Sequence, residues 1–344
     1  MMEPPAHLAW QCTKGCNLRC IHCYANAGRE AGDELTTEEA ERLMDSAAEM
    51  GIKSIVFTGG EPLLRQDILK LILFARDVGL KPIIATNGSR LNENIVQTLR
   101  DAGGSVAVDL PAVNEGVHGA FTGVPGSLQA KLEAIAECLR SGVSCSVGVA
   151  VTRVNVGEVH EVVGFAKKNN IYCDVLAVVP VGRAKPELLP DPMKYYGLMQ
   201  DLLRRWHAVP MNAISEGAKT MVSVYEPFYV VLAATEGYEV PGKLCTLGRA
   251  IHVMEDGSVR PCTFAPIKVG NVRGQRLKDI WEAMTRSEVL TKLNNADLLK
   301  GSCGRCEHKK ICGGCRVRAY AMTGDWFASD PMCFLTEVQT TATF

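Results

Sequence analysis

The stretch WQCTKGCNLRCIHCYANAG, residues 10–28, places four cysteines within twelve positions. Three of them, Cys16, Cys20 and Cys23, follow the spacing C-x3-C-x2-C just after the apolar run 7–11. Three thiolates in one loop can hold three irons of a [4Fe–4S] cube, which leaves the fourth iron without a protein ligand. A structural zinc site with a distant fourth ligand is the alternative, although zinc loops more often carry two C-x2-4-C pairs.

The composition is that of a globular protein with one large or two moderate domains. The chain has 344 residues, a formal charge of -1, 47% hydrophobic residues and 22% charged residues. It lacks the basic excess of a nucleic-acid surface, a membrane-spanning apolar run and a signal-peptide pattern. We therefore expect a cytoplasmic protein that has no nucleic-acid partner and no membrane partner.

Fourteen cysteines are the unusual feature of the composition. In a reducing compartment, clustered cysteines indicate metal or redox chemistry rather than disulfides. Cys138, Cys145 and Cys173 stand in apolar stretches, so we expect them to be core thiols. Cys12 lies on a predicted strand that leads to the first cluster, and we expect it to pack as well.

Short apolar runs alternate with amphipathic helical patterns from residue 8 to about residue 206. The predicted strands are 7–11, 54–58, 82–86, 105–110, 145–151 and 173–179. The predicted helices open at a capping box, Thr36 with Glu39, and near Asp67, Asn92, Ser127, Val156 and Asp191. Glycines that stop four of these helices are Gly51, Gly79, Gly103 and Gly142.

Six β–α units predict an α/β fold with a parallel sheet whose functional residues gather at the carboxyl ends of the strands. Because a full barrel needs eight units, we expect a partial, open (βα)6 barrel. The rhythm stops after Trp206. The sequence therefore predicts a barrel over 1–206, a connecting segment over 207–243 and a small cysteine-rich domain over 244–344.

The cysteine motif at the end of a first strand resembles the signature of the radical SAM superfamily. This resemblance implies a [4Fe–4S] cluster on Cys16, Cys20 and Cys23, whose open iron binds the amine and carboxylate of S-adenosylmethionine. It also implies reductive cleavage of that cofactor to a 5′-deoxyadenosyl radical, which abstracts a hydrogen from the substrate. His22 occupies the position that usually holds an aromatic residue near the adenine.

Further motifs support the resemblance at the ends of later strands. Gly59-Gly60-Glu61-Pro62 is similar to the GGEP motif of the family; the glycines allow close backbone approach, and Glu61 can pair with a cationic amine. A simple turn between strand and helix is the alternative for this run. The other implied cofactor contacts are Asn87, Asp109 and Val181.

One strand end departs from the family pattern. Relatives often carry Ser-x-Asp-Gly at the end of strand four, where this chain keeps Asp109 but has Ala107 and Leu110 in place of the serine and glycine. The resemblance therefore supports fewer contacts to the ribose or carboxylate of the cofactor through this strand. No aspartate, histidine or tyrosine is identified as a catalytic proton donor.

Seven cysteines in the tail resemble the SPASM extension, which holds up to two auxiliary [4Fe–4S] clusters. The resemblance assigns Cys303, Cys306, Cys312 and Cys333 to one cluster and Cys245, Cys262 and Cys315 to the other. The second set lacks a fourth thiolate, so its last site is open to substrate or filled by another side chain. Zinc that fastens a non-enzymatic interaction module is the competing interpretation, but zinc ribbons separate their pairs by 15–20 residues, against five here.

The substrate is suggested by the run CGGCRVRAYAMTGD, residues 312–325, which resembles enzymes of haem and haem d1 biosynthesis. Those enzymes remove or oxidise carboxylate side chains of a tetrapyrrole. Arg316 and Arg318 can offer planar donors to such carboxylates, or can form a structural pair beneath the cluster. A flavodoxin or ferredoxin is the implied electron donor.

A ribosomal peptide maturase, which crosslinks or oxidises a precursor peptide, is the alternative function. Many such enzymes carry a leader-binding segment ahead of the barrel. The chain before Cys16 leaves no room for that segment, which weakens the peptide interpretation without excluding it.

Overall fold

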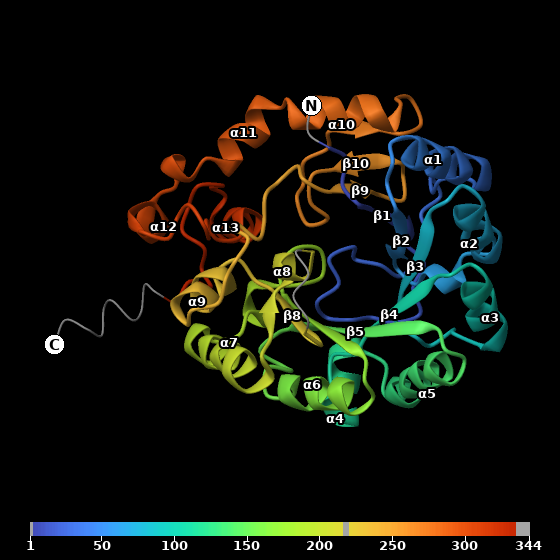
Figure 1. The fold of residues 1–344 in the computed structure, drawn as a ribbon, viewed down its shortest axis with the longest axis horizontal. Coiled ribbons are helices and arrows are strands. Elements are labelled where there is room, and N and C mark those ends of the chain that lie inside the picture. Colours follow the sequence, from blue (N-terminus) through green and yellow to red (C-terminus); the bar gives the residue numbers. More distant parts are fainter. Residues whose placement is uncertain (1–2, 216–219, 335–344) are drawn as a thin grey trace.

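A single mixed sheet with helices on its outer side forms the framework of the computed structural model, which describes residues 3–215 and 220–334 (Figure 1). The strand order is β11-β10-β9-β1-β2-β3-β4-β5-β6-β8-β7. Strands β1 to β6 are adjacent and parallel in sequence order. The predicted six-unit open barrel is therefore confirmed as the central part of a wider sheet.

The six predicted strands all form, with bounds close to those expected. They are β1 (His7–Thr13), β2 (Ser54–Gly59), β3 (Lys81–Thr86), β4 (Ser105–Asp109), β5 (Ser144–Val151) and β6 (Tyr172–Ala177). The six predicted helices also form, as α1 (Thr37–Glu49), α2 (Ile68–Asp77), α3 (Glu93–Asp101), α5 (Ser127–Arg140), α6 (Val159–Lys168) and α7 (Pro192–Trp206). Helix α4 (Glu115–Thr122) is an addition that the sequence pattern did not predict.

Local signals explain where these helices begin and end. The Thr36 hydroxyl accepts from the Glu39 amide, and the Glu39 carboxylate accepts from the Thr36 amide, so both halves of the capping box are present. The four predicted glycine stops have positive φ angles, between 62° and 84°. A residue with a side chain would be strained at such φ angles, whereas glycine adopts them freely. Glycine therefore allows the chain to turn where each helix ends.

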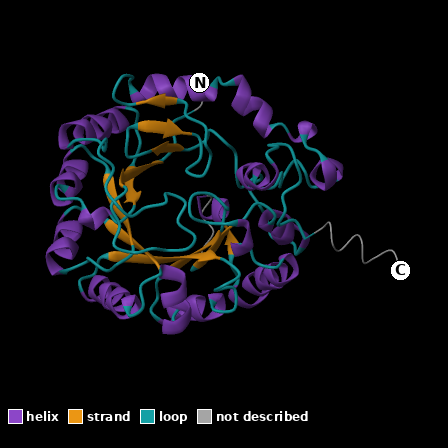
Figure 2. Cartoon of the chain, turned by 180° about the vertical axis from the view of Figure 1, so that it is seen from behind, coloured by secondary structure: helices purple, strands orange, loops and turns teal. Residues whose placement is uncertain are grey.

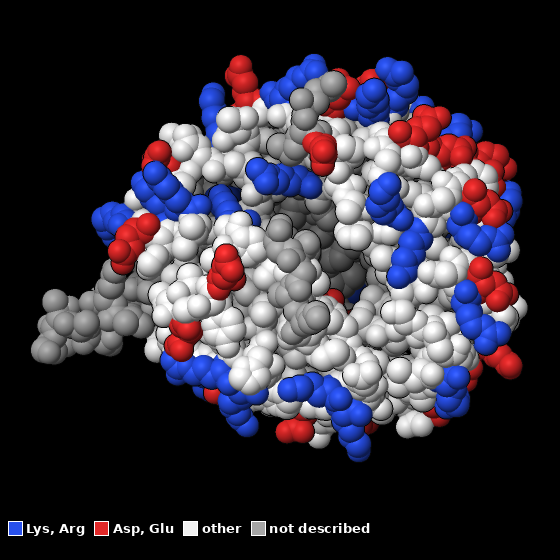
Figure 3. All heavy atoms as spheres, viewed as in Figure 1, with Lys and Arg blue, Asp and Glu red and all other residues white. Residues whose placement is uncertain are grey.

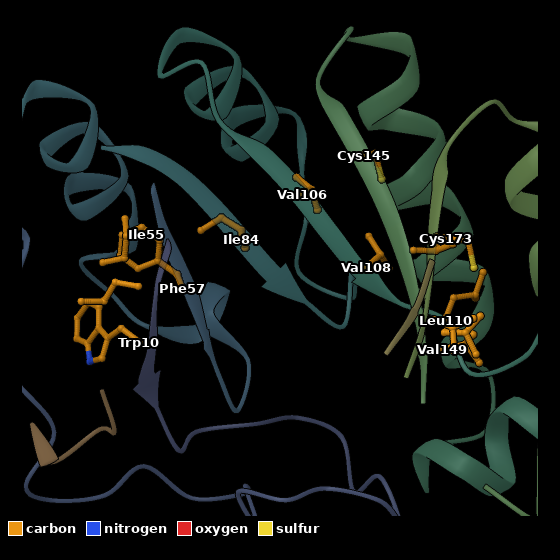
Figure 4. Close-up of a cluster of buried hydrophobic side chains, with 14 of the residues drawn as sticks. Trp10, Ile55, Phe57, Ile84, Val106, Val108, Leu110, Cys145, Val149 and Cys173 are labelled. Carbon is orange, nitrogen blue, oxygen red and sulfur yellow. The ribbon is translucent and has the colours of Figure 1, made fainter. Parts of the chain in front are cut away.

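The main core lies between the sheet and the outer helices. Trp10, Phe57, Ile84 and Val108 are fully buried and face the helices, as Figure 4 shows for neighbouring strands. Cys12, Cys138, Cys145 and Cys173 belong to the same core, as expected for packing thiols. Because side chains alternate along a strand, the other half of each strand faces the interior of the barrel.

Both edges of the sheet are extended by chain from outside the six units. Residues 207–243 contain β7 (Val209–Pro210), α8 (Met211–Ser215), β8 (Val222–Tyr225) and α9 (Tyr229–Thr235), and β8 pairs with β6 in parallel. At the other edge β9 (Ile251–Val253) pairs with β1 in parallel, and β10 (Ser258–Arg260) and β11 (Gly270–Asn271) follow in antiparallel. The segment predicted as a connection thus contributes strands to the sheet.

The C-terminal helices continue the layer of helices around the outside of the sheet, as the view from behind in Figure 2 shows. They are α10 (Leu277–Thr285), α11 (Glu288–Asn294), α12 (Gly301–Arg305) and α13 (Arg316–Thr323); three short 3-10 turns, Pro62–Leu64, Pro186–Leu188 and Ala296–Leu298, complete the elements. The division into domains stays a prediction, and its outermost residues, 1–2 and 335–344, lie outside the described chain. Among the described helices, none has the length and apolar character that crossing a membrane requires.

Candidate functional site

Cys16, Cys20 and Cys23 line one cavity of about 310 Å³ inside the barrel. The loop that carries them leaves β1 at its carboxyl end, and the cavity wall continues over the inner faces of β2 to β6. Five of the predicted cofactor contacts also line it: His22, Gly59, Gly60, Asn87 and Asp109. In Figure 3 the molecule is hollowed near the middle of the face shown, inside the ring of strands seen in Figure 1.

The two glycines at the end of β2 let the cysteine loop approach the sheet. The Gly60 amide donates to the Thr13 carbonyl, and the Glu61 amide donates to the Gly15 carbonyl, each at 2.7 Å. A Cβ atom on Gly60 would lie 2.1 Å from the Gly15 oxygen, and one on Gly59, whose φ is 129°, would lie 2.3 Å from the Thr13 oxygen. Only glycine permits this packing, which fixes the loop that carries Cys16.

Glu61 lies outside the cavity, which differs from the direct amine contact that the motif suggested. Its carboxylate is fully buried and accepts from the Thr86 hydroxyl (2.7 Å), the Asn87 amide (2.7 Å) and the Leu63 amide (3.1 Å). Burial raises the pKa of Glu61, and these hydrogen bonds oppose that shift. In this structure Glu61 positions the Asn87 turn, while Pro62 begins the 3-10 turn and does not line the cavity.

His22 and Asn87 present polar groups near the cysteines. The His22 ring packs on Phe121 with 4.6 Å between ring centroids, and its buried Nδ1 has no hydrogen-bond partner in the described chain. Burial lowers the pKa of His22, which favours the neutral ring. The Asn87 Nδ2 donates to Asn17 Oδ1 (3.0 Å) and lies 4.0 Å from Cys16 Sγ. An unpartnered nitrogen beside three thiols fits a site that holds a polar ligand.

A row of paired residues across three strands places two acids inside the same cavity. Asp109 on β4 pairs with Gly148 on β5, and Gly148 pairs with Asp174 on β6. Gly148 has no side chain, so the wall between the two carboxylates is recessed. The Lys131 ammonium hydrogen-bonds the Asp109 carbonyl.

Asp174 is a site residue that the sequence interpretation missed. The Ser223 hydroxyl donates to it at 2.5 Å, and burial raises the pKa of Asp174 to about 6. The available signal was a lone acid within the apolar run 173–179, which is unusual for a core strand.

Val181 does not reach the cysteine cavity. It lines a separate hollow of about 360 Å³ with Tyr24, Gly182 and Phe264. Tyr24 lines both hollows and meets Phe264 edge to face at 5.3 Å between ring centroids. The two hollows therefore share Tyr24 in their walls.

The C-terminal cysteines gather in the two predicted groups. Cys303, Cys306, Cys312 and Cys333 line a cavity of about 260 Å³. Cys245, Cys262 and Cys315 line another of about 480 Å³. Burial raises the pKa of Cys245 and Cys262 to about 11, so these thiols need a cation nearby to be held as thiolates.

The larger cavity reaches from these cysteines back into the barrel. Val56 of β2 and Leu176 of β6 line it, and Leu176 also lines the cavity of the first cysteine loop. Its remaining wall is mainly apolar, with Lys243, His252, Arg316 and Arg318 as basic groups. The two cavities are therefore neighbours across one leucine side chain.

Arg316 and Arg318 differ in what they can bind. Arg318 is buried and bonds Glu226 and Asp330 through four contacts of 2.7–2.9 Å, so its suggested role toward substrate carboxylates is wrong. It is the structural member of the pair. Arg316 donates through Nη1 to the Trp326 and Ala328 carbonyls, while its Nε and Nη2 have no partner in the described chain.

The cysteine groups suit iron–sulfur clusters better than single ions. Within residues 3–215 and 220–334, no three His, Cys, Asp or Glu side chains are grouped so that they could hold one metal ion. A zinc ion draws its sulfur ligands to about 2.3 Å, whereas a [4Fe–4S] cube distributes its thiolates over four irons. Three sets of cysteines around open cavities therefore fit three clusters.

Comparison with known proteins agrees with these features. Residues 10–166 match the family model described as the radical SAM superfamily, and residues 245–315 match an iron–sulfur cluster-binding domain. An "AdoMet-dependent heme synthase" of Methanosarcina barkeri is 33% identical, with 97% of each chain covered. An "Fe-coproporphyrin III synthase" of the same organism is 27% identical, covering 96% of this chain and 88% of the relative.

A solved structure shares the fold at low sequence identity. The Streptococcus suis protein SuiB bound to S-adenosylmethionine aligns with a TM-score of 0.75 and 18% identity, covering 97% of this chain and 78% of SuiB. The family models, the similarity along the whole chain and the grouped cysteines lead to one assignment: this chain belongs to the radical SAM superfamily, in the SPASM-bearing group that includes the AdoMet-dependent heme synthases.

Proposed function

We propose that this radical SAM enzyme modifies carboxylate-bearing side chains of a tetrapyrrole. The observation that carries the proposal is the mainly apolar cavity of about 480 Å³ that is lined by Cys245, Cys262 and Cys315 and shares Leu176 with the cavity of the first cysteine loop. That volume is within the range of sites for small organic ligands. The relatives named for haem and iron-coproporphyrin synthesis favour the same substrate class.

The proposal assigns the clusters to three sets of cysteines. Cys16, Cys20 and Cys23 would hold the cluster that binds S-adenosylmethionine; the auxiliary clusters would lie on Cys303, Cys306, Cys312 and Cys333, and on Cys245, Cys262 and Cys315. When bound and reduced, the first cluster with its S-adenosylmethionine supplies a 5′-deoxyadenosyl radical. His22, Gly59, Gly60, Asn87 and Asp109 would contact that cofactor, since they line its cavity.

The chain's own residues would orient the substrate and keep water away from it. Val56 and Leu176 offer apolar contact to a macrocycle. Burial lowers the pKa of Lys243, and a substrate carboxylate beside it would favour the charged form. Arg316 lines the same wall, and its buried Nε and Nη2 have no hydrogen-bond partner in the described chain.

The proposal also covers the location of the enzyme, its electron donor and its division into domains. The enzyme would work in the cytoplasm and receive electrons from a flavodoxin or ferredoxin. Its barrel would span 1–206 and its auxiliary domain 244–344, with 207–243 between them.

The test is an anaerobic turnover assay. Reconstituted and reduced enzyme receives S-adenosylmethionine with iron-coproporphyrin or didecarboxysiroheme. The quantities measured are 5′-deoxyadenosine and the mass of the tetrapyrrole. We expect deoxyadenosine above the substrate-free background, coupled to loss of a carboxylate-bearing fragment.

Two matched variants sharpen the assay. Lys243→Met removes the basic group beside the cavity and should raise the KM for the tetrapyrrole about tenfold, whereas Lys278→Met on the exposed face of α10 should leave it unchanged. Cleavage of S-adenosylmethionine with unchanged tetrapyrroles would refute the substrate and favour a precursor peptide. A colourless zinc protein that forms no deoxyadenosine would refute the enzyme.

A further inference from the structure

The hollow of about 360 Å³ that Val181 lines, called the side hollow below, adjoins both inner cavities. It shares Tyr24 with the cavity of the first cysteine loop. With the larger cavity of about 480 Å³ it shares Thr263, Phe264 and Val317. Tyr24 and Phe264 meet at 5.3 Å between ring centroids, so their contact lies where the three spaces adjoin. The side hollow is therefore the space next to the larger cavity for a ligand that extends beyond it.

Arg260 gives the side hollow its charge. Among the described residues that line this hollow, Arg260 alone has a charged side chain, and two tyrosines, a phenylalanine and two prolines form much of the remaining wall. The guanidinium of Arg260 forms no hydrogen bond or ion pair with residues 3–215 or 220–334. A planar cation beside aromatic rings suits a flat ligand that carries a carboxylate.

The register of the sheet directs Arg260 toward the interior of the barrel. Arg260 of β10 is paired with His252 of the antiparallel strand β9, and residues directly opposite each other extend from the same face of a sheet. His252 lines the larger cavity, so this is the inner face. The preceding residue, Val259, belongs to the hydrophobic core, as expected for the opposite face. The half-buried Arg260 therefore extends into the side hollow from the same face that His252 presents to the larger cavity.

The carboxylates of a tetrapyrrole need partners of this kind. A carboxylate that is removed from water without a cation or a hydrogen-bond donor is unfavourable, and a mainly apolar cavity offers few of either. Arg318 lines the larger cavity, but Glu226 and Asp330 already occupy its guanidinium. Arg260 has no such partner within the described chain, so it can accept the carboxylate of a ligand.

We propose that Arg260 binds a carboxylate of the tetrapyrrole that does not react, and that the side hollow holds the edge of the macrocycle that carries it. The inference rests on the proposed tetrapyrrole substrate. Arg260 is then a specificity-determining residue, because it favours a macrocycle that carries this additional carboxylate over one in which the carboxylate is absent or neutral.

The first test compares charged and neutral forms of one ligand. Unreduced, anaerobic holoenzyme is titrated with iron-coproporphyrin and with its methyl ester in the same buffer, and absorbance reports binding. Arg260→Met should weaken binding of the acid about tenfold and leave the ester unaffected, since a hydrogen bond to a charged group is lost only with the acid. Arg260→Lys should lose less affinity, because it keeps the charge without the planar fork. The control is Arg249→Met, because Arg249 is exposed and does not line the side hollow. Equal affinity of wild type and Arg260→Met for the acid would overturn the proposal.

The second test fills the side hollow without changing Arg260. Ala321 of α13 is exposed and lines this hollow, so the indole of Ala321→Trp should narrow it and weaken binding of iron-coproporphyrin about tenfold. Met322→Trp places the same ring at the next residue, which is 36% exposed and does not line the hollow, and should bind like wild type. Unchanged affinity in Ala321→Trp would place the macrocycle elsewhere and contradict the inference.

Further measurements separate failure of the inference from failure of the proposed function. Wild type that neither binds nor modifies iron-coproporphyrin would refute the substrate, and the inference with it. Wild type that binds and modifies it, with equal affinity in Arg260→Met, would refute the role of Arg260 alone. Calorimetry with S-adenosylmethionine should give one affinity for both proteins, and a weaker affinity in Arg260→Met would assign the arginine to the cofactor instead. Iron analysis checks that the variants keep their clusters; if Arg260→Met loses iron, Arg260→Lys and Ala321→Trp decide the question.

Discussion

Gly60 is a position where the absence of a side chain determines the site. Its amide bonds the Thr13 carbonyl, and a Cβ atom there would lie 2.1 Å from the Gly15 oxygen. The obstacle is backbone, so it cannot be relieved by a rotamer change. The loop that carries Cys16 would have to move away from β2.

We therefore predict that Gly60→Ala disrupts the first cluster. Iron should fall by about four per chain, and deoxyadenosine formation should fall at least a hundredfold. The control is Gly32→Ala, because Gly32 is exposed and a Cβ atom there meets nothing within 4 Å. Iron analysis and the deoxyadenosine assay check both variants. Full cluster occupancy in Gly60→Ala would show that the loop tolerates displacement.

Asp174 gives the site a pH dependence in the mildly acidic range. Its pKa is raised to about 6 because burial disfavours the anion, so the carboxyl is mostly neutral below pH 6 and mostly charged above it. S-adenosylmethionine carries a sulfonium cation, which favours the charged carboxylate. Binding should therefore tighten by up to about fourfold from pH 5.5 to pH 7, since the charged fraction of a carboxyl with a pKa of about 6 rises from about one quarter to about nine tenths over that range.

Titration calorimetry across this range, on unreduced enzyme, measures the effect. Asp174→Asn should flatten the profile, whereas Asp279→Asn, at an exposed position of α10, should keep it. Ser223→Ala removes a hydrogen bond that lowers the pKa of Asp174, so the midpoint should move to higher pH. Equal profiles for wild type and Asp174→Asn would assign the titration to another group.

At the scale of elements, one buried ion cluster joins three segments of the auxiliary region. Arg318 of α13 bonds Glu226, which follows β8, and Asp330 in the final described loop. Asp330 also accepts from the Cys315 amide at 2.6 Å, and its own amide lies 3.4 Å from Cys303 Sγ. The cluster therefore holds members of both auxiliary cysteine groups in place.

We predict that Arg318→Met leaves two buried carboxylates without a cation and costs about 3–5 kcal/mol of stability. Auxiliary iron should be lost in parallel. Arg276→Met is the control, because Arg276 and its partner Asp279 are exposed, and such pairs contribute about 1 kcal/mol or less. Anaerobic unfolding and iron analysis measure both effects. In the triple variant Arg318→Met, Glu226→Gln, Asp330→Asn, much of the stability should return; no recovery would contradict the charge explanation.

Element length decides how much of the fold could be predicted from sequence. The six core strands have five to eight residues and a clear apolar pattern, so all six were predictable. Strands β7, β9, β10 and β11 have only two or three residues, which is too short for an alternation of apolar and polar residues to appear. Their pairing comes from tertiary contacts, as between β9 and β1.

The same distinction applies to the site. Cys16, Cys20, Cys23 and the two glycines were predictable because they stand in fixed local motifs. Asp174 was not, because its place in the cavity depends on its cross-strand register with Gly148. Glu61 shows the limit of a motif. Its carboxylate accepts hydrogen bonds from Thr86 and Asn87, and the sequence could not reveal these contacts.

At the scale of the whole molecule, the barrel and the cysteine-rich region form one continuous interior. The sheet runs from β11 to β7 without interruption, and β9 lies directly beside β1. The cavity of the first cysteine loop and the larger cavity share Leu176. A radical generated in the first cavity would reach a substrate in the second across that residue.

We predict that Leu176→Phe separates radical formation from substrate reaction. The larger ring should narrow the space that joins the two cavities, while the cysteines that hold the first cluster stay in place. Cleavage of S-adenosylmethionine should remain within about threefold of wild type, but deoxyadenosine formed per modified tetrapyrrole should rise at least tenfold. Leu298→Phe, at a position 43% exposed, is the control for the added ring. Both yields are measured in one anaerobic reaction by mass spectrometry, and an unchanged ratio in Leu176→Phe would show that substrate meets the radical by another route.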